Sequence, residues 1–201
     1  MSVKWKTTTN KLPKITQTLE TLGKKRIEVG AIDGEHAWLA GIHEYGATIV
    51  PKNAQYLTVP CHPKAVGRKA REFSDLWTLR ANSGELFLCR NTGKDSFDVY
   101  YWLAKSVKIP ERAFLRRSHD ENGEDVLKKC ERALGLVASG DMNLDEYMDM
   151  VGRNYTTMVK KYIRDLKDPP NSPLTVEAKG SDNPLIGKTN GLVESISYRV
   201  K

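Results

Sequence analysis

Long apolar runs are missing from this sequence of 201 residues. No stretch comes near the roughly 18 apolar residues that mark a membrane-spanning helix, so we expect no membrane segment. The first residues, Met1 to Lys14, also lack the apolar core of a secretory signal peptide. Cysteine is scarce, because Cys61, Cys89 and Cys130 are odd in number and far apart. Such usage is typical of a protein made in a reducing cytosol, where thiols pack as small apolar side chains.

The sequence also lacks the motifs of common catalytic and metal sites. The segment 179–181, KGS, has no upstream glycine at the spacing of a phosphate loop, and no G-x-S-x-G elbow or recognisable cysteine nucleophile occurs. His43 and Glu44 begin like a zinc-protease helix, but Ala47 stands where the second histidine belongs. On a helix, His36 would lie about 10 Å along the axis from His43. That separation does not suit one zinc ion, whose bonds to nitrogen are about 2 Å long.

The charge balance gives an indication of the kind of partner, because the formal net charge at pH 7 is +7. A basic protein is attracted to nucleic acids and acidic proteins, although dispersed cations also serve only to solvate a surface. Most cations here are dispersed, and no zinc-finger, RNP or helix-turn-helix signature accompanies them. Weak contact with DNA phosphates stays open, since it requires only positive charge. The local clusters are Lys64, Arg68, Lys69 and Arg71, followed by Trp77, and Arg112, Arg116 and Arg117.

The first part of the chain is predicted to form a helix, a strand and a second helix. Residues 8–23 repeat apolar positions every three or four residues, 24–30 alternate as in a strand, and 35–45 return to the helical period. Gly23 and Gly46 are placed to end the two helices. In the first helix, Ile15, Leu19 and Leu22 fall on one face. In the second, we expect a buried stripe of Trp38, Leu39 and Ile42.

A β-rich region follows between residues 50 and 108. We interpret 81–84 as a hairpin loop, 91–94 as a turn and Pro110 as the end of the last strand. The basic stretch 62–73 is expected to hold a helical turn. The region is rich enough in aromatic residues for a sheet with one packed face. The predicted strands are 56–60, 77–80, 85–90 and 99–109.

Two long helices are predicted after this region. The first ends at Gly140, and the second begins with a capping-box pair, Asn143 and Glu146, and stops before Pro169 and Pro170. Each helix carries apolar residues on one face, and the stripe of the second helix is expected to lie in a core or against a partner. The stripes are Val126, Leu127, Cys130, Leu134 and Val137 in the first helix, and Leu144, Tyr147, Met148, Val151, Tyr155, Met158, Val159, Tyr162, Ile163 and Leu166 in the second.

The last stretch, 168–200, is dense in proline and glycine, yet residues 195–200 alternate as a strand does. Its apolar clusters need a buried surface, so we predict an ordered extended loop that adds a final strand to a sheet; the alternative is a solvated tail. The element order indicates an α+β fold in which an antiparallel sheet packs against two or three helices. We expect a single domain over 1–201, with 50–108 as a β-rich insertion and 168–201 as a C-terminal wrapping segment.

Three separated motifs occur in order along the chain: residues 43–47, HEYGA; residues 108–116, KIPERAFLR; and residues 170–192, which contain PNSPLT, KG, NPLI and GL. Together they resemble the virion morphogenesis and tail-completion proteins of tailed bacteriophages, whose pattern is H-E-F/Y-G, I-P-x-R-x-F-L-R, P-L-x-x-x-T, K-G and P-L-I-D-T-G-x-L. Two departures are residues 187–191, GKTNG, where the pattern has D-T-G, and the length of 50–108. The residues that carry the resemblance are His43, Glu44, Tyr45 and Gly46; Pro110, Arg112, Phe114, Leu115 and Arg116; and Pro173, Thr175, Lys179, Gly180, Pro184, Leu185, Gly191 and Leu192.

The resemblance implies a structural protein with no active site, cofactor or metal ion, which forms a ring, expected to be a homo-hexamer, in the virion neck. As a head–tail connector, tail-completion or tail-terminator protein it would be assembled in the host cytoplasm and join head to tail. Its partners would be neck and tail proteins on the adaptor or portal side and on the tail-tube or sheath side. Non-specific DNA contact in the lumen is possible, and membrane contact is not expected. Alternatives are a basic DNA-binding accessory protein of phage assembly and, more remotely, a hydrolase.

The second motif has a physical reading of its own. Pro110 fixes its own φ angle and keeps Ile109 out of helical geometry, so the chain bends there. Arg112 is then placed to pair with a carboxylate, the alternative being a plain surface cation. Phe114 and Leu115 are expected to enter either an interface or the core of the domain itself.

Overall fold

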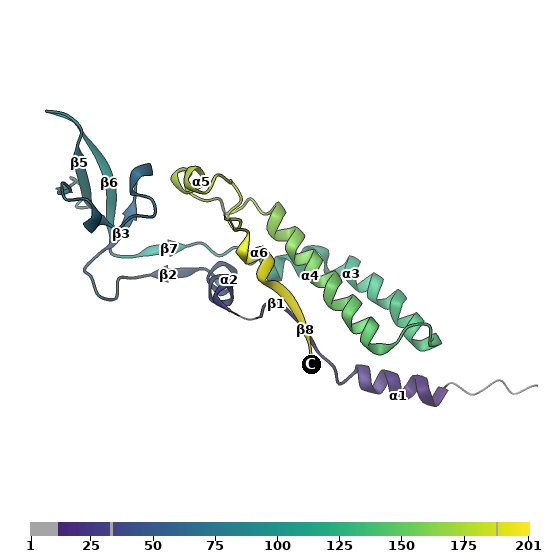
Figure 1. Ribbon diagram of the computed structural model, residues 1–201. Coiled ribbons are helices and arrows are strands. Elements are labelled where there is room, and N and C mark those ends of the chain that lie inside the picture. The colour runs from purple at the N-terminus through teal and green to yellow at the C-terminus, as the bar shows by residue number, and fades with distance from the viewer. Residues whose placement is uncertain (1–11, 33, 188) are drawn as a thin grey trace, which may run out of the picture. The chain divides into compact units, whose positions relative to one another are not determined.

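The computed structural model describes residues 12–32, 34–187 and 189–201, and its elements confirm the α+β class (Figure 1). The chain divides into two compact units. The helical unit takes the described residues up to Ala37, then Phe114–Ile163 and Leu192–Lys201. The strand unit takes Trp38–Ala113 and Arg164–Gly191. The single domain over 1–201 stays a prediction, and the two units are described separately below.

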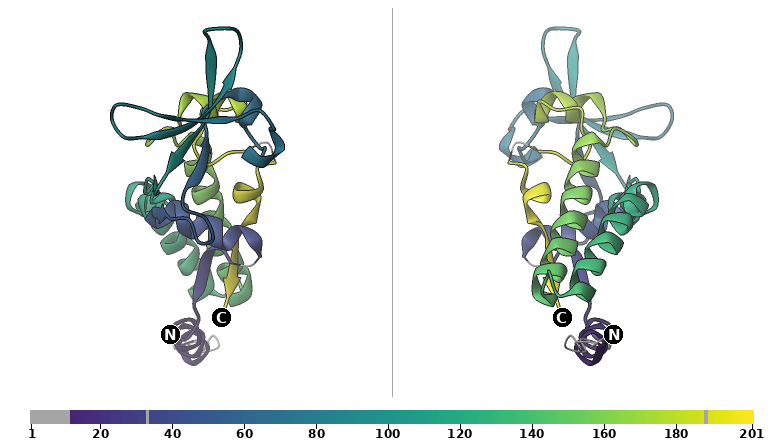
Figure 2. Two further views of the ribbon diagram at one scale, coloured as in Figure 1. Left: turned by 90° about the vertical axis from the view of Figure 1, so that its left-hand side faces the viewer. Right: turned by 90° about the vertical axis from the view of Figure 1, so that its right-hand side faces the viewer.

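The helical unit is built on two long antiparallel helices, α3 (Phe114–Ser139) and α4 (Leu144–Asp165), which lie side by side in all views (Figures 1 and 2). The predicted capping box is confirmed. The backbone N–H of Asn143 donates to Glu146 Oε2 at 3.0 Å, and the N–H of Glu146 donates to Asn143 Oδ1 at 2.9 Å. Their core contains Ala133, Val137, Tyr147 and Met148.

A two-stranded antiparallel sheet completes this unit. Strand β8 (Ile196–Val200) pairs with β1 (Ile27–Ala31) in the register Ile27↔Val200, so the predicted final strand is confirmed. Helix α1 (Leu12–Leu22) precedes β1, and α6 (Gly191–Ser195) leads into β8. Residues 8–11 of the predicted first helix lie outside the described residues.

The strand unit contains a four-stranded antiparallel sheet in the order β3-β6-β5-β4. Tyr100 and Tyr101 of β6 are buried against Ala65, and this cluster forms the core of the sheet's packed face. Strands β2 and β7 pair separately as a narrow ribbon. The strands are β2 (Ala47–Ile49), β3 (Leu57–Pro60), β4 (Trp77–Arg80), β5 (Leu86–Asn91), β6 (Phe97–Ala104) and β7 (Val107–Ile109).

The strand unit also has helical stretches outside the sheet. The helical turn predicted within 62–73 is present as two short 3₁₀ helices, Pro63–Ala65 and Ala70–Glu72. Helix α2 (Glu35–Tyr45) has the predicted bounds, and α5 (Pro173–Lys179) is an addition. None of the described helices is both long and apolar enough to cross a membrane.

Several expectations from the sequence were wrong in detail. Residues 99–109 are not one strand, because the ladder of β6 with β3 ends at Ala104 and β7 pairs with β2 instead. The extended C-terminal loop contains the helices α5 and α6. Leu127 is 48 % exposed, because it lies at the edge of the stripe that Val126 and Cys130 form.

A further error concerns the buried face of α2. Trp38 was expected in it, but its side chain is 72 % exposed. The buried positions are Ala40 and Glu44, at 5 % and 2 % exposure. At about 100° per residue, Ala40 lies roughly 200° around the helix from Trp38. A small residue and a carboxylate thus face inward, which an apolar periodicity does not predict.

Gly152 of α4 is required by close packing inside the helical unit. A Cβ atom at this position would overlap the ring of Tyr198, whose hydroxyl donates to the carboxylate of Asp149. We expect Gly152→Ala to lower the free energy of unfolding by about 1–3 kcal/mol through overpacking. Urea unfolding followed by helical circular dichroism measures this change.

Gly135 of α3 supplies the matched control, because it is exposed and a Cβ there meets nothing within 4 Å. Gly135→Ala should raise stability by about 0.5–1 kcal/mol, since alanine loses less backbone entropy in a helix. Equal effects of the two substitutions would contradict the packing of α4 against β8.

Candidate functional site

The first two motifs meet at the C-terminal end of α2, where Gly46 ends the helix. Gly46 has a φ angle of +71°, which suits glycine. A Cβ atom here would lie 3.0 Å from both the Ile109 carbonyl oxygen and the Glu111 backbone nitrogen. Immediately afterwards β2 pairs with β7, with Ala47 opposite Ile109. The glycine of the first motif therefore allows the second motif to run directly beside it.

Two backbone hydrogen bonds join the motifs beyond the ribbon. The N–H of Arg112 donates to the His43 carbonyl at 2.8 Å, and the N–H of Ala113 donates to the Glu44 carbonyl at 3.2 Å. These carbonyls belong to the last turn of α2, whose acceptors have no partner within the helix. Ala113 has a φ angle of 47°, unusual for a residue other than glycine. The second motif thus caps the helix that ends in the first.

The side chain of Arg112 is buried within this junction, at 3 % exposure. Its Nη1 lies 2.9 Å from His43 Nδ1, and its Nη2 donates to Asn171 Oδ1 at 3.2 Å. A guanidinium can only donate, so His43 accepts at Nδ1 and a neutral ring carries its proton on Nε2. The expectation that Arg112 pairs with a carboxylate was therefore wrong, because the described acceptors of its side chain are an imidazole and an amide. The surface-cation alternative is wrong too.

His43 is held neutral by its surroundings. Burial is the largest cause that lowers its pKa, to about 4, and the positive charges of Arg112 and Lys179 add to this effect. Burial also lowers the pKa of Arg112 and of Lys179, and for Lys179 the charge of Arg112 contributes. The cluster of His43, Arg112, Asn171 and Lys179, called the junction cluster here, holds two cations and no carboxylate.

The third motif folds into a turn fixed by buried polar groups. Lys179 Nζ donates to the carbonyls of Asn183 and Pro184 at 3.1 and 3.3 Å. The Asn183 side chain is 3 % exposed; its Oδ1 accepts from the N–H groups of Leu185 and Ile186 at 2.8 and 2.9 Å. Its Nδ2 donates to the Arg164 carbonyl at 2.9 Å. The turn therefore brings Lys179 to the junction cluster and buries Leu185.

The remaining motif residues lie in several places. Ser172 caps α5 ahead of Pro173 and Thr175, and Gly180 ends the same helix at a φ angle of 69°. Pro184 is buried beside Leu185, whereas Tyr45 and Pro110 are exposed. The structure therefore unites the residues around His43 and Arg112 with Lys179. The others lie at the starts of two helices: fully buried Phe114, Leu115 and Arg116 begin α3, and Gly191 and buried Leu192 begin α6.

Sequence reasoning did not single out Asn171 and Asn183. Both lie in the Pro-rich segment. The side-chain amide of Asn171 accepts from Arg112, and that of Asn183 donates to the Arg164 carbonyl. The available signal was an asparagine placed next to proline, where it favours local turns. That signal predicts a turn; it does not predict that Asn171 would accept from a distant arginine.

A second constellation, Cys61, His62 and Asp98, has the residue types of a thiol nucleophile and its base. His62 Nδ1 accepts the Lys64 backbone N–H at 3.1 Å, and Nε2 lies 3.5 Å from the Asp98 carboxylate. Both ring nitrogens face other groups, and the Cys61 thiol lies 3.5 Å from the Val59 carbonyl. The trio is not arranged for proton transfer from the thiol. Over the described residues, no group of three His, Cys, Asp or Glu side chains could hold a metal ion.

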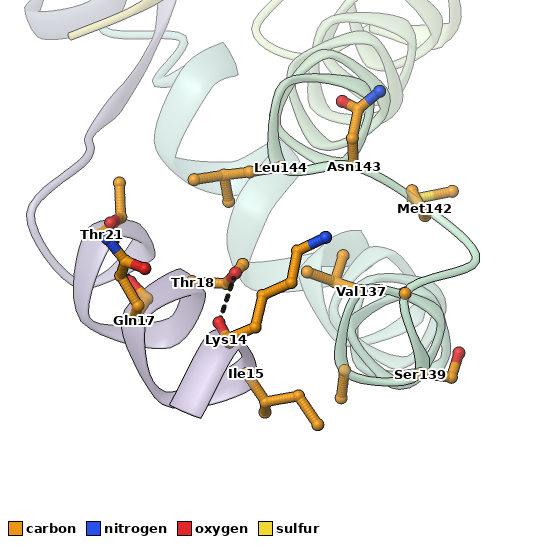
Figure 3. Close-up of a pocket in the computed structure, with 12 residues that line it drawn as sticks. Lys14, Ile15, Gln17, Thr18, Thr21, Val137, Ser139, Met142, Asn143 and Leu144 are labelled. Carbon is orange, nitrogen blue, oxygen red and sulfur yellow. Dashed lines mark hydrogen bonds between the residues drawn. The ribbon is translucent and has the colours of Figure 1, made fainter. Parts of the chain in front are cut away.

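The largest described cavity lies in the helical unit, between α1 and the α3–α4 turn, and has a volume of about 430 Å³ (Figure 3). Ile15, Val137, Met142 and Leu144 give it an apolar lining, and Lys14 extends beside them (Figure 3). It contains no acid–base pair. A smaller described cavity in the strand unit, of about 350 Å³, is lined by the motif residues Thr175 and Lys179, together with Ser172 and Leu174.

Comparisons with protein-family models, with curated proteins and with solved structures found no match to this chain.

The contact of Gly46 with the second motif can be tested by adding one methyl group. Gly46→Ala forces a left-handed alanine and drives its Cβ against the backbone at Ile109 and Glu111. We expect it to lower the free energy of unfolding by about 3 kcal/mol or more, from strain and overpacking together. Chemical denaturation of the purified variant measures the change.

Gly67 is the matched control in the same unit, with a φ angle of 74° and nothing within 4 Å of a Cβ. Gly67→Ala should cost only about 1 kcal/mol, from the backbone conformation alone. If the two variants were equally stable, close approach of the motifs would be wrong.

The pKa of His43 generates a pH dependence with a defined sign. The unfolded chain takes up a proton at this ring near pH 6.5, whereas the folded protein does so only near pH 4. The contribution of His43 is therefore complete above pH 6.5 and is lost as the pH falls through about 4. NMR titration of labelled histidine should show one ring with a midpoint close to 4.

A stability measurement then assigns this behaviour. His43→Gln should lose less free energy of unfolding between pH 7 and pH 4.5 than the wild type does. His119→Gln, which alters a ring stacked on Tyr155, should keep the wild-type loss. An unchanged pH dependence in His43→Gln would refute the assignment.

Proposed function

We propose that this protein is a structural subunit of a tailed-bacteriophage virion that forms a ring, as a homo-hexamer, in the neck. In this position it joins head to tail as a head–tail connector, tail-completion or tail-terminator protein. Its partners are other neck and tail proteins, on the head side and on the tail side.

The observation that carries the proposal is the convergence of the three motifs. Residues far apart in sequence, His43, Arg112 and the segment 171–185, form a junction held by backbone caps and buried side-chain hydrogen bonds. These are the positions on which the resemblance to tail-completion proteins rests. In the strand unit these residues hold separate stretches of the chain in place, which suits a structural subunit.

A second observation supports assembly. The strand unit carries an apolar surface, called the α2–β2 face, where α2 leads through Gly46 into β2. Trp38 and Tyr45 are 72 % and 69 % exposed, and their spacing of seven places them on one side of the helix. Val50 is 57 % exposed just after β2. Trp and Tyr are enriched among the residues that dominate protein–protein binding, so this face suits a subunit contact.

A ring requires two different surfaces on each subunit that meet by rotation. The α2–β2 face supplies one such surface. The helix that carries it, α2, is held by the hydrogen bond of His43 with Arg112 in the junction cluster. Anchoring an aromatic pair on a capped helix reduces the ordering cost of association. The arrangement therefore suits side-by-side joining of copies better than binding of a small molecule.

Size-exclusion chromatography with light scattering, combined with electron microscopy of virions, tests the proposal. We expect a hexamer in solution, or a monomer that enters rings only on its neck partners, and density for the subunit at the head–tail joint. A chain that stays monomeric with those partners and never enters virions would overturn it.

The α2–β2 face generates a quantitative prediction. Trp38→Ala should weaken ring association by about 2 kcal/mol per contact or more, on the order of thirtyfold, because truncation of a central aromatic residue removes its buried area. The concentration at which rings dissociate, followed by light scattering, measures this change. Phe97→Ala is the control, since Phe97 is 45 % exposed elsewhere on the strand unit. Equal weakening by both variants would contradict the assigned face.

A further inference from the structure

A loop on the strand unit concentrates positive charge. It covers residues 62–73 between β3 and β4, holds the two 3₁₀ helices, and is called the basic loop here. Four exposed cations, Lys64, Arg68, Lys69 and Arg71, fall within eight residues, and the loop contains a single carboxylate, Glu72.

The backbone of the basic loop is fixed to the sheet. The Tyr101 hydroxyl lies within hydrogen-bond distance of the Ala65 and Arg68 carbonyls, at 3.3 and 3.0 Å. Ala65 is fully buried, and the ring of His62 stacks on Tyr100 with centroids 4.5 Å apart. The cations therefore project from a rigid base, so that less conformational entropy is lost when they bind a ligand.

The charges of the loop are only partly neutralised within the protein. Glu72 accepts from the Lys69 backbone N–H at 2.9 Å and from Arg68 Nε at 3.3 Å, and these contacts lower its pKa. The Arg68 guanidinium also lies 4.1 Å from the centroid of the Phe73 ring. Arg68 and Glu72 thus form an internal pair. Lys64, Lys69 and Arg71 have no carboxylate within ion-pair distance among the described residues, unlike Lys128 with Glu124.

The chemistry of the loop selects the kind of partner. Its apolar residues Ala65, Ala70 and Phe73 pack inward against the tyrosines of β6, so they do not anchor an acidic peptide. What remains outward is positive charge on flexible side chains. Such a surface matches a polyanion with closely spaced charges, and duplex DNA has one per about 1.7 Å of helix axis. Contacts of this kind hold the phosphate backbone and carry no sequence information.

We propose that the basic loop binds the phosphate backbone of double-stranded DNA without sequence preference, through Lys64, Lys69 and Arg71. This binding activity does not depend on ring formation. Each neutralised phosphate contributes about 0.9 to the slope of log affinity against log salt concentration. Loss of all three cations should therefore reduce that slope by about 2.7 and weaken binding at 0.1 M salt by on the order of a hundredfold or more.

The test compares two triple variants of the full chain that remove the same formal charge. The loop variant is Lys64→Gln/Lys69→Gln/Arg71→Gln. The control is Lys128→Gln/Lys129→Gln/Arg132→Gln on an exposed stretch of α3. Fluorescence anisotropy with two duplexes of unrelated sequence, in 25–200 mM NaCl, gives affinity and salt slope for each protein, and circular dichroism confirms that each is folded.

We expect equal affinity of the wild type for both duplexes, a slope reduced by about 2.7 in the loop variant, and a smaller change in the control. No binding of the wild type at 25 mM NaCl would overturn the proposal. Equal losses in the two variants would overturn it as well, because they would indicate diffuse attraction to net charge. Strong preference for one duplex, or equally tight binding of polyglutamate, would contradict backbone contact as its basis. A monomer that binds DNA would leave this proposal standing while the ring proposal fails.

Discussion

The hydrogen bonds from the Arg112 and Ala113 backbone to the last turn of α2 are the constraint on which the strand unit depends. They satisfy helix acceptors that would otherwise need water, and they fix where β7 ends relative to β2. Only with that backbone in place can the Arg112 side chain turn inward to His43 and Asn171. The two guanidinium nitrogens that make these contacts bind neutral acceptors, an imidazole and an amide.

Local signals in the sequence predicted those parts of the fold that local chemistry decides. The pairing of Asn143 with Glu146 and the bounds of α2 needed only neighbours within one turn. The final strand was also predictable, because residues 195–200 alternate and had to find a sheet edge. Its partner β1 was not, since strand pairing at the far end of the chain leaves no local pattern.

The candidate site was only half predictable for the same reason. Motif order pointed to His43, Arg112 and Lys179, but not to the bonds between them. Arg112 was matched with a carboxylate because opposite charges attract, whereas the structure places it between an imidazole and an amide. Trp38 was assigned to a core because tryptophan is apolar; the inward face of α2 is instead taken by Ala40 and Glu44. In both cases the tertiary surroundings overrode a residue's average preference.

The two outward-facing surfaces of the strand unit are each carried by elements that make buried contacts on their other side. The junction cluster uses buried donors and acceptors from three stretches of chain, so α2 is held from one side and shows Trp38 and Tyr45 on the other. The tyrosines of β6 likewise contact the apolar residues and carbonyls of the basic loop. Its cations Lys64, Lys69 and Arg71 are exposed to solvent. The exposed aromatic side chains of the α2–β2 face suit contact with another protein, and the unneutralised cations of the basic loop suit a polyanion. In the proposed assembly, a subunit that carries both surfaces would be able to hold its neighbours and a nucleic acid at the same time, because the two surfaces use different residues and different physical forces.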